Sequence, residues 1–404
     1  MDDLQRIALG LASRISRAVA IDDPQLNLIT HTAHDDRVDA HRVASVMTLR
    51  APDEVIAHAL AQGIATADGP VRVPAIAEID LFARVCVPVR CQGLLFGYLW
   101  IIDHDGTLTD EELQLTVEAA AASGQVLYRE QLLDDLRDSR ERDLLRDVLA
   151  DDPTVSAAAA ALLVEEEMLP PSPYLSVLVV QVESESHAET DGVRNALDIA
   201  FRSAGRRANP LTCLSLSRAG GRGVLLLAGR RAPGGQDVRD LALSLRDELV
   251  KGLGDAAQVR IGIGPVLHGA DQASASARRA REALDVAGLV SGFDAVTAWD
   301  ELGVYRLLVK LPLDDLPEDA IPAGLLTLMA ADGEGPLVET LETWLDEGCD
   351  SRATVARLQV HRTSLYYRLG RIEEITGLSL NSGAARLDLH LGLKLARLQG
   401  LLSK

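Results

Sequence analysis

Residues 351–376 read SRATVARLQVHRTSLYYRLGRIEEIT, and the pattern in this stretch decides the architecture of the C-terminal end. Either Asp350 or Ser351 is a good N-cap for a short helix, because both side chains accept hydrogen bonds from the free N–H groups of a first turn. Residues 359–361 would form a turn before a second helix, from about residue 362 to residue 375. The residues of the first helix expected to face the core are Ala353, Ala356 and Leu358. The stretch therefore predicts two short helices joined by a tight turn.

The second of these helices has one face for the core and one for solvent. Leu365, Leu369 and Ile372 recur at helical spacing and would form its buried stripe. At about 100° per residue, the side chains that point away from this stripe are Thr363, Tyr367, Gly370 and Glu374. An exposed helix start suits the major groove of DNA, where arginine reaches guanine edges, hydroxyls reach bases or phosphates, and free N–H groups meet a phosphate. The candidate DNA-contacting residues are His361, Arg362, Thr363, Ser364, Tyr367, Arg368 and Arg371.

This segment is basic although the chain is acidic. The net charge of the chain is −20, whereas residues 351–404 hold nine Lys/Arg and three Asp/Glu. Such asymmetry suggests a nucleic-acid contact confined to one part of the chain. A preceding helix that ends at Gly348 is expected, because four apolar residues share one helical face: Leu337, Leu341, Trp344 and Leu345. The alternative is a small helical bundle with a solvated charged face.

Residues 356–369, ARLQVHRTSLYYRL, resemble the C-terminal helix-turn-helix of PucR/CdaR-type transcription regulators. The GLSL step at residues 377–380 and the stretch 387–398 resemble the closing part of the same domain. The resemblance implies that the partner is double-stranded operator DNA. Two positions depart from the family pattern, with Thr363 in place of Asn and Ser364 in place of Thr. The operator sequence therefore stays open.

The middle of the chain predicts a ferredoxin-like α+β domain. Strands are expected at 175–182, 211–216, 223–227 and 259–264, with helices at 192–207, 237–252 and 269–287. Residues 172–290 are similar to the GGDEF-like domain of the same regulators. An active diguanylate cyclase needs an acidic turn to hold metal, but residues 218–223 read RAGGRG. We therefore expect no catalytic residues and a structural role, with nucleotide binding without turnover as the alternative.

Residues 1–128 resemble a GAF-type sensory domain. The expected elements are helices at 1–20 and 52–62, strands at 25–31 and 71–74, and a hairpin of 82–90 with 94–102. GAF folds hold small ligands beside the sheet, so this domain could bind an effector; a ligand-free dimerisation domain is the alternative. His31, His34 and His41 are too loosely spaced to predict a metal site. A helix that begins at Thr109 would run to about residue 150, and it either pairs with its copy in a dimer or packs on its own domain.

The expected fold class is therefore multidomain α+β, with a GAF-like sensory domain, a ferredoxin-like/GGDEF-like domain and an all-α helix-turn-helix domain. The expected boundaries are 1–128 for the sensory domain, 129–152 for a linking helix, 153–300 for the GGDEF-like domain, 301–335 for a helical connector and 336–404 for the DNA-binding domain.

The leading hypothesis is a homodimeric, or higher even oligomeric, ligand-responsive transcription regulator that acts as an activator. The alternative is a nucleotide-binding or signalling protein of cyclase-related fold whose C-terminal bundle contacts proteins. We expect no enzyme activity, because the sequence has no Walker loop, nucleophile elbow or zinc pair. We also expect no cofactor, no metal, no membrane partner and a cytoplasmic bacterial protein with reduced thiols, because apolar runs are short, the start lacks a signal-peptide pattern and the four cysteines form no CxxC pair.

Overall fold

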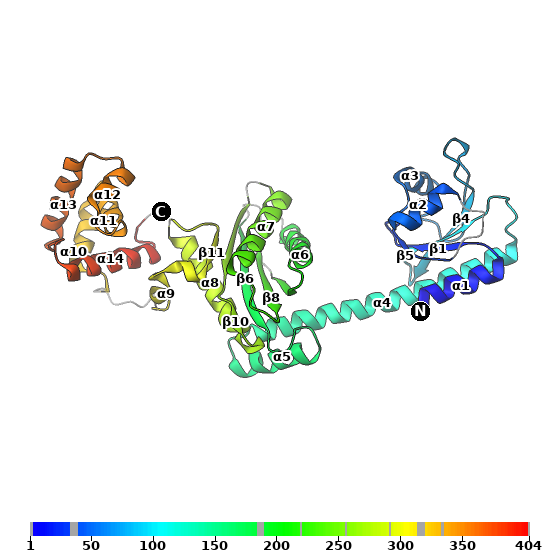
Figure 1. The fold of residues 1–404 in the computed structure, drawn as a ribbon, viewed down its shortest axis with the longest axis horizontal. Coiled ribbons are helices and arrows are strands. Elements are labelled where there is room, and N and C mark those ends of the chain that lie inside the picture. Colours follow the sequence, from blue (N-terminus) through cyan, green and yellow to red (C-terminus); the bar gives the residue numbers. More distant parts are fainter. Residues whose placement is uncertain are drawn as a thin grey trace. The chain divides into compact units, whose positions relative to one another are not determined.

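The computed structural model describes residues 3–32, 39–183, 190–218, 220–254, 257–290, 292–312, 320–332 and 335–402 (Figure 1). The chain divides into two compact units, Met1–Ser139 and Arg140–Lys404. None of the described helices combines the length and the apolar character needed to cross a membrane. The finer division into five segments stays a prediction.

The first unit contains a five-stranded antiparallel sheet. Its strand order is β2 (Leu28–His31), β1 (Val19–Asp22), β5 (Leu94–Ile102), β4 (Arg84–Cys91) and β3 (Val71–Val73). The predicted hairpin is confirmed as β4 and β5, and its turn at Gln92 and Gly93 uses positive φ angles of 52° and 80°. The expected helix 1–20 ends earlier, because Ser16 takes a positive φ and the chain then enters β1. The sequence analysis missed this strand, which is four residues long and fully buried.

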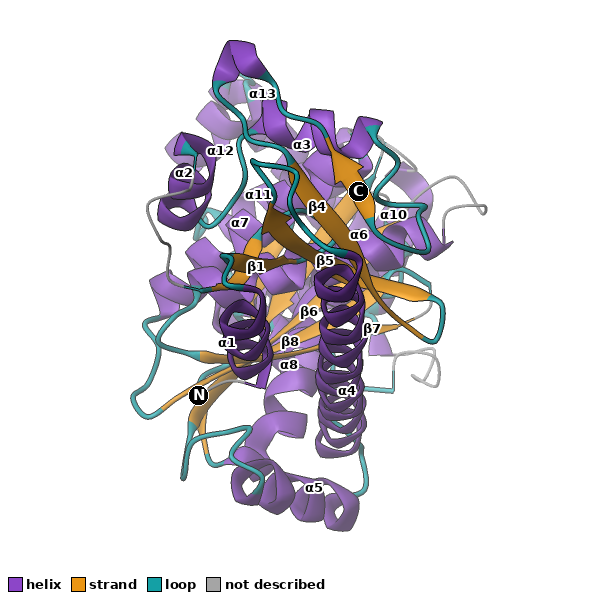
Figure 2. Cartoon of the chain, turned by 90° about the vertical axis from the view of Figure 1, so that its right-hand side faces the viewer, coloured by secondary structure: helices purple, strands orange, loops and turns teal. Residues whose placement is uncertain are grey.

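Helices cover both faces of this sheet. Helix α1 (Asp3–Ile15) and the first part of α4 (Asp110–Val148) lie side by side on one face, where Leu4, Leu11 and Ala120 share a core with the sheet (Figures 1 and 2). The other face carries α2 (Ala40–Thr48) and α3 (Asp53–Ala61), and a short 3-10 helix follows at Ala77–Ile79. Helix α2 was not expected, since the side chain that it buries is a charged one, that of Arg42.

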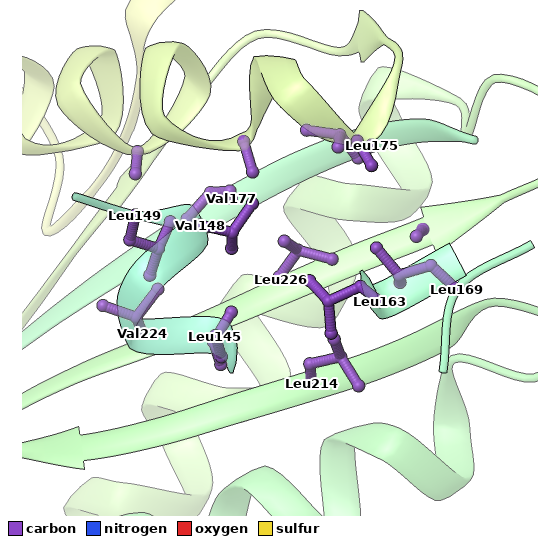
Figure 3. Close-up of a cluster of buried hydrophobic side chains, with 14 of the residues drawn as sticks. Leu145, Val148, Leu149, Leu163, Leu169, Leu175, Val177, Leu214, Val224 and Leu226 are labelled. Atoms are coloured by element: carbon purple, nitrogen blue, oxygen red, sulfur yellow. The ribbon is translucent and has the colours of Figure 1, made fainter. Parts of the chain in front are cut away.

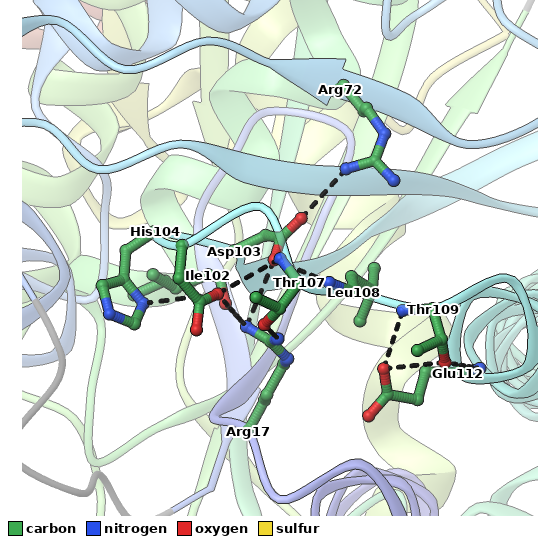
Figure 4. Close-up of polar contacts among 10 residues, drawn as sticks. Arg17, Arg72, Ile102, Asp103, His104, Thr107, Leu108, Thr109 and Glu112 are labelled. Atoms are coloured by element: carbon green, nitrogen blue, oxygen red, sulfur yellow. Dashed lines mark hydrogen bonds and ion pairs between the residues drawn. The ribbon is translucent and has the colours of Figure 1, made fainter.

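Helix α4 begins where the sequence predicted. Thr109 and Glu112 form a capping box, in which the Thr109 backbone N–H donates to Glu112 Oε2 at 2.8 Å and the Glu112 N–H donates to Thr109 Oγ1 at 3.3 Å (Figure 4). Just upstream, the buried carboxylate of Asp103 accepts hydrogen bonds from Arg72 and from the Leu108 N–H and forms an ion pair with Arg17 at 3.2 Å. These contacts hold the turn between β5 and α4. The helix continues to Val148, as expected.

The second unit contains the ferredoxin-like sheet that the element order predicted. The strand order is β11 (Val296–Ala298), β9 (Gln258–Ile263), β6 (Tyr174–Glu183), β8 (Arg222–Gly229) and β7 (Thr212–Arg218), and β10 (Leu267–His268) also pairs with β6. Strand β6 is antiparallel to both β8 and β9, and β11 adds a parallel strand at the edge. The order of β9, β6, β8 and β7 is that of a βαββαβ ferredoxin-like fold. The short strand β11 was not expected.

Alternation along β6 explains the two layers of helices. Leu178 and Val180 face the core under α6 (Thr190–Arg207) and α7 (Gly235–Leu253). Val177 and Val179 face the opposite core, which includes Leu145 and the helices α5 (Pro153–Glu165) and α8 (Ala273–Leu289) (Figure 3). Buried side chains on both faces explain why β6 reads as a nearly continuous apolar run.

The C-terminal part of this unit is helical. The expected connector contains a 3-10 helix at Trp299–Leu302, α9 (Tyr305–Leu308) and α10 (Ala323–Asp332), while residues 313–319 lie outside the described chain. Then come α11 (Pro336–Asp346), α12 (Ser351–Leu358), α13 (Arg362–Thr376) and α14 (Gly383–Leu398). Helices α10, α11, α13 and α14 share one apolar core, which positions α13 and the short α12 beside it.

Candidate nucleic-acid interface

Helix α12 begins at the predicted N-cap. The carboxylate of Asp350 accepts hydrogen bonds from the backbone N–H groups of Arg352 at 2.7 Å and Ala353 at 2.9 Å. The helix ends at Gln359, which takes a left-handed conformation with φ 56°. The cap and this end fix the length of α12 at little more than two turns.

The predicted buried face of α12 was wrong in part. Ala356 is exposed, and Ala353 and Leu358 are half-buried. The fully buried side chain is that of Thr354, whose hydroxyl donates to the Asp350 carbonyl at 2.6 Å. A threonine can be buried in a helix because it satisfies its hydroxyl with the carbonyl four residues earlier. The apolar pattern alone therefore predicted a buried face of α12 that is displaced by about one residue from the observed one.

Helix α13 is anchored as predicted. Leu365, Leu369 and Ile372 are buried in the common core. His361 is the N-cap, and its Nδ1 accepts a hydrogen bond from the Thr363 backbone N–H at 3.3 Å. Because the buried stripe fixes the rotation of the helix, the residues from His361 to Ser364 are all exposed at its N-terminal end.

Arg362 is held in place by an aromatic neighbour. Its guanidinium lies over the ring of Tyr366, 5.4 Å from the centroid, and its Nη2 donates to the Tyr366 hydroxyl at 3.2 Å. Hydrogen bonds with Ser351 and with Arg362 hold the pKa of Tyr366 below its usual value. Tyr366 was missed by the sequence analysis, although its position four residues after Arg362 is the spacing at which helical side chains meet.

The Ser351 contact also brings the first turn of α12 next to α13. Arg352, which follows Ser351, is exposed. Tyr367, one residue after Tyr366, is 75% exposed. Arg352 and Tyr366 thus join the predicted residues at one end of the helix pair.

Two of the predicted residues are engaged elsewhere. Arg368 is half-buried, and its Nη1 donates to Thr340 Oγ1 of α11 at 3.1 Å. Arg371 is exposed and forms an ion pair with Glu374 at 2.6 Å. The structure therefore gathers His361, Arg362, Thr363, Ser364 and Tyr367 at the start of the helix, while Arg368 connects α13 to α11.

Part of the basic charge of this segment serves the fold. Lys394 and Arg397 of α14 are mostly buried and pair with Glu342 of α11, at 3.2 Å and 2.7 Å. Lys394 also pairs with Asp346 at 2.8 Å, and Arg357 pairs with Glu347 at 2.7 Å. Local net charge therefore overstates the cationic surface that is free to meet DNA, and the exposed start of α13 is a better guide to the interface.

The turn of the middle domain carries cations instead of carboxylates. Gly220 and Gly221 turn between β7 and β8 with φ angles of 74° and 70°. Burial and the nearby Arg281, Arg146 and Arg222 lower the pKa of Arg218 at the start of this turn. Ala219 lies outside the described residues. The described part of the turn offers no ligand for a divalent cation.

The histidines of the first unit, from which no metal site was predicted, have ordinary surroundings where the structure describes them. His41 Nε2 is hydrogen-bonded to the Ile79 carbonyl at 2.7 Å, and His34 lies outside the described chain. No group of three or more His, Cys, Asp or Glu side chains among the described residues could hold a metal ion. All four cysteines are free thiols, and burial raises the pKa of Cys86.

Two family models match this chain. The PucR C-terminal helix-turn-helix domain matches residues 337–395, which contain the whole of α12 and α13. The GGDEF-like domain matches residues 151–286, from the N-cap region of α5 into α8. The two matches coincide with the C-terminal helical bundle and with most of the ferredoxin-like sheet and its helices.

Three relatives of known role are similar to this chain. The DNA-binding transcriptional activator AdeR of Bacillus subtilis (strain 168) is 24% identical over 409 residues, which cover 98% of this chain and 93% of AdeR. The proline-responsive transcriptional activator PutR of the same organism is 22% identical over 98% of this chain and 97% of PutR. The carbohydrate diacid regulator of Escherichia coli (strain K12) is 37% identical over 93 residues, 22% of this chain and 24% of that protein. The similarity to the first two relatives therefore extends over nearly the whole chain and is not limited to a single domain.

Proposed function

We propose that this chain, a DNA-binding transcriptional regulator of the PucR type, reads its operator with the exposed start of α13. One observation carries the proposal: α13 buries Leu365, Leu369 and Ile372 while it exposes every residue from His361 to Ser364. A recognition helix needs this division, because its first turns must enter the major groove while the opposite face stays in the core.

Each exposed residue has a distinct contact to make. Arg362 and Arg352 can reach base edges or phosphates, and Thr363 and Ser364 can donate to phosphate oxygens or bases. Tyr367 can pack against the sugar-phosphate backbone, and the N–H groups of the first turn can bind a phosphate. Arg371 lies on the flank and can reach the backbone if it leaves Glu374.

The test is binding of the purified full chain to the DNA that flanks its own gene. Fluorescence anisotropy should show saturable binding that resists an excess of unrelated DNA, and the affinity should fall as salt rises because phosphate contacts release counterions. A chain that lacks residues 336–404 should not bind. Equal binding by the full and the shortened chain would place the DNA contact outside α12 and α13.

We propose in addition that the protein acts as a homodimer and as an activator. A single helix-turn-helix contacts a half-site, so specific affinity normally requires two. AdeR and PutR, which align with nearly the whole chain, are both described as activators. Residues 131–140 of α4 are all exposed in the single chain and include Leu132, Leu133 and Leu136, which supports pairing through this helix.

We also propose that the first unit responds to a small molecule and that the middle domain has no cyclase activity. PutR is described as proline-responsive, and its alignment includes the first unit of this chain. The relatives are regulators, and the turn at Gly220 and Gly221 has cationic neighbours where a cyclase needs carboxylates. A cytoplasmic location stays a prediction.

A further inference from the structure

A small hollow in the first unit is lined by buried charges of opposite sign. It lies between the sheet and the two helices α2 and α3. The residues that line it include Asp22 of β1, Arg42 of α2 and Trp100 of β5. Its apolar wall includes Leu26, Val55 and Ile56. Asp22 is 8% exposed and Arg42 is 4% exposed. Arg84 of β4, which is 7% exposed, also lines the hollow, so three ionisable groups are buried at one small site.

Two of the polar side chains that line this hollow, those of Arg42 and Trp100, have a buried nitrogen without a hydrogen-bond partner in the described chain. In the described chain, the guanidinium of Arg42 forms no hydrogen bond and no ion pair within 4.0 Å, and its Nε is buried without a partner. The indole Nε1 of Trp100 is likewise buried without a hydrogen bond of normal geometry, although it lies close enough to Asp22 to lower the pKa of that carboxyl. A buried charge without an ion-pair partner destabilises the folded state, so its presence in a folded protein needs an explanation.

Arg84, by contrast with Arg42, forms a structural ion pair in the same domain. Arg84 Nη2 donates to Asp39 Oδ2 at 2.5 Å, and its Nε donates to the Phe82 carbonyl at 3.3 Å. Asp39 also accepts from the Phe82 backbone N–H. Arg84 is therefore satisfied within the fold, whereas Arg42 is not. Burial raises the pKa of Asp22 to about 6, despite the opposing effect of Arg42.

We propose that this hollow is the effector site and that it takes a small zwitterion of the α-amino-acid class. The carboxylate of the ligand would accept hydrogen bonds from Arg42 and from Trp100 Nε1, and its ammonium group would donate to the carboxylate of Asp22. A ligand with one group of each sign pairs with both Asp22 and Arg42, whereas a simple acid or a simple amine pairs with one of them. This inference rests on the proposed response to a small molecule.

Binding at this site would move α2. About 20 Å³ of the hollow is wide enough for water, which is room for one or two molecules, so an amino acid must widen it. The Asp39–Arg84 ion pair and the contact of His41 with the Ile79 carbonyl hold the N-terminal end of helix α2. The widening would therefore come from its C-terminal part, which buries no side chain fully and where Ser45 lines the hollow. A ligand that binds the widened state better shifts the population toward it, and this shift is the signal that the rest of the chain can read.

The test is a thermal-shift screen of the full chain with the standard amino acids at millimolar concentration, followed by calorimetry on each amino acid that stabilises the protein. For each such amino acid, the carboxylic acid without the amine and the amide without the carboxylate are titrated in parallel. The intact zwitterion should bind tightest, and each analogue should bind about 10- to 100-fold more weakly, as expected for loss of a charged hydrogen bond.

The variants D22N and R42Q test the site, and R50Q, a change at an exposed arginine, is the matched control. D22N should remove the preference for the amino acid over the carboxylic acid, R42Q should remove the preference over the amide, and R50Q should bind as the wild type does. Circular dichroism reports whether each variant is folded. If a variant does not fold, the preference of the wild type among the three ligands still tests the proposal.

Three results would overturn the inference: no amino acid stabilises the wild type, an analogue binds as tightly as the zwitterion, or folded D22N and R42Q bind as the wild type does. Operator affinity of the ligand-free wild type is measured on the same samples. Intact operator binding without amino-acid binding rejects this site alone, whereas absent operator binding rejects the proposed DNA-binding function.

Discussion

Among single residues, two arginines on α13 have different surroundings, although the sequence predicted that both contact DNA. Arg362 is exposed at the helix start, and its guanidinium stacks on Tyr366. Arg368 lies half-buried against α11 and donates to Thr340. In the proposed DNA contact, this stacking would orient Arg362 in advance and lower the entropy lost on binding. Arg368 instead contributes to the packing that holds α13.

The exchange of Arg362 for alanine should weaken specific operator binding by about 10- to 100-fold, as expected for the loss of one base or phosphate contact. Anisotropy titrations at fixed salt measure the effect. Arg202→Ala, at an exposed position on α6, is the matched control and should leave the affinity unchanged. An unchanged affinity of the Arg362 variant would show that this helix end does not contact the operator.

Arg368→Ala should behave in the opposite way. Loss of the hydrogen bond to Thr340 should lower the free energy of unfolding of the C-terminal bundle by about 1 kcal/mol. Urea unfolding of the full chain in a W100F/W299F background, where Trp344 of that bundle is the remaining tryptophan, measures it by fluorescence. Operator affinity, measured where the variant is folded, should fall less than for Arg362→Ala. A larger loss of affinity for the Arg368 variant would assign the DNA contact to Arg368.

At the scale of elements, an ion network joins α11 to α14, two of the helices that share one apolar core with α13. Asp346 is hydrogen-bonded to His390 Nε2 at 2.7 Å and forms an ion pair with Lys394 at 2.8 Å. Burial favours its neutral form, but the hydrogen bonds from His390 and Lys394 outweigh burial and lower the pKa of Asp346 to about 2. The ionised carboxylate therefore stabilises the folded bundle.

Asp346→Asn should reduce the stability of the bundle by about 1–2 kcal/mol at neutral pH, after allowance for its partial exposure to solvent. Because the folded pKa lies below the unfolded value of 3.8, this contribution is fully present above 3.8 and is lost as pH falls toward 2. Urea unfolding midpoints of the two proteins should converge over that range. Asp388→Asn, at an exposed position on α14, should show no such difference. A constant gap between Asp346→Asn and wild type at all pH values would contradict the assignment.

The β7–β8 turn is the element that decides the chemistry of the middle domain. Its cationic surroundings lead us to expect no cyclic dinucleotide from GTP and magnesium. Chromatography of the reaction, with heat-inactivated protein as the control, measures the product. Product formed above that control would require metal ligands that the turn between Arg218 and Arg222 does not supply.

For the whole molecule, the proposed homodimer raises the question of which part of the chain would hold two copies together. The described C-terminal bundle gathers most of its apolar side chains into one internal core, although Leu387 of α14 is 60% exposed and Leu401 is 54% exposed. By contrast, α4 exposes Leu132, Leu133 and Leu136 at 44%, 58% and 65% in the single chain. Exposed leucines at this spacing on one long helix favour pairing with a second copy.

Deletion of residues 336–404 should therefore leave a homodimer or a higher even oligomer, and the isolated C-terminal fragment should be monomeric. Light scattering gives the mass of both. A triple change of the three leucines of α4 to serine should weaken the dimer, and the same change at Leu243, Leu289 and Leu307, which are exposed elsewhere, is the control. A monomeric truncated chain beside a dimeric fragment would place the interface in the DNA-binding domain.

Local patterns determined much of this protein from its sequence alone. The caps at Thr109 and Asp350, the glycine-containing hairpin turns and the buried stripe of α13 all depend on residues close together in the chain, so spacing reveals them. The order of strands and helices likewise predicted the ferredoxin-like sheet.

The tertiary structure alone decided which charged side chains are free. Arg368 meets Thr340, Arg397 meets Glu342, and Asp22 shares a hollow with Arg42 and Trp100, in each case across different elements. Periodicity places a side chain on a face, but it does not reveal which distant residue completes an ion pair or leaves a charge unpaired. That outcome depends on how the elements pack, because burial and partner distance set the energy of a charge.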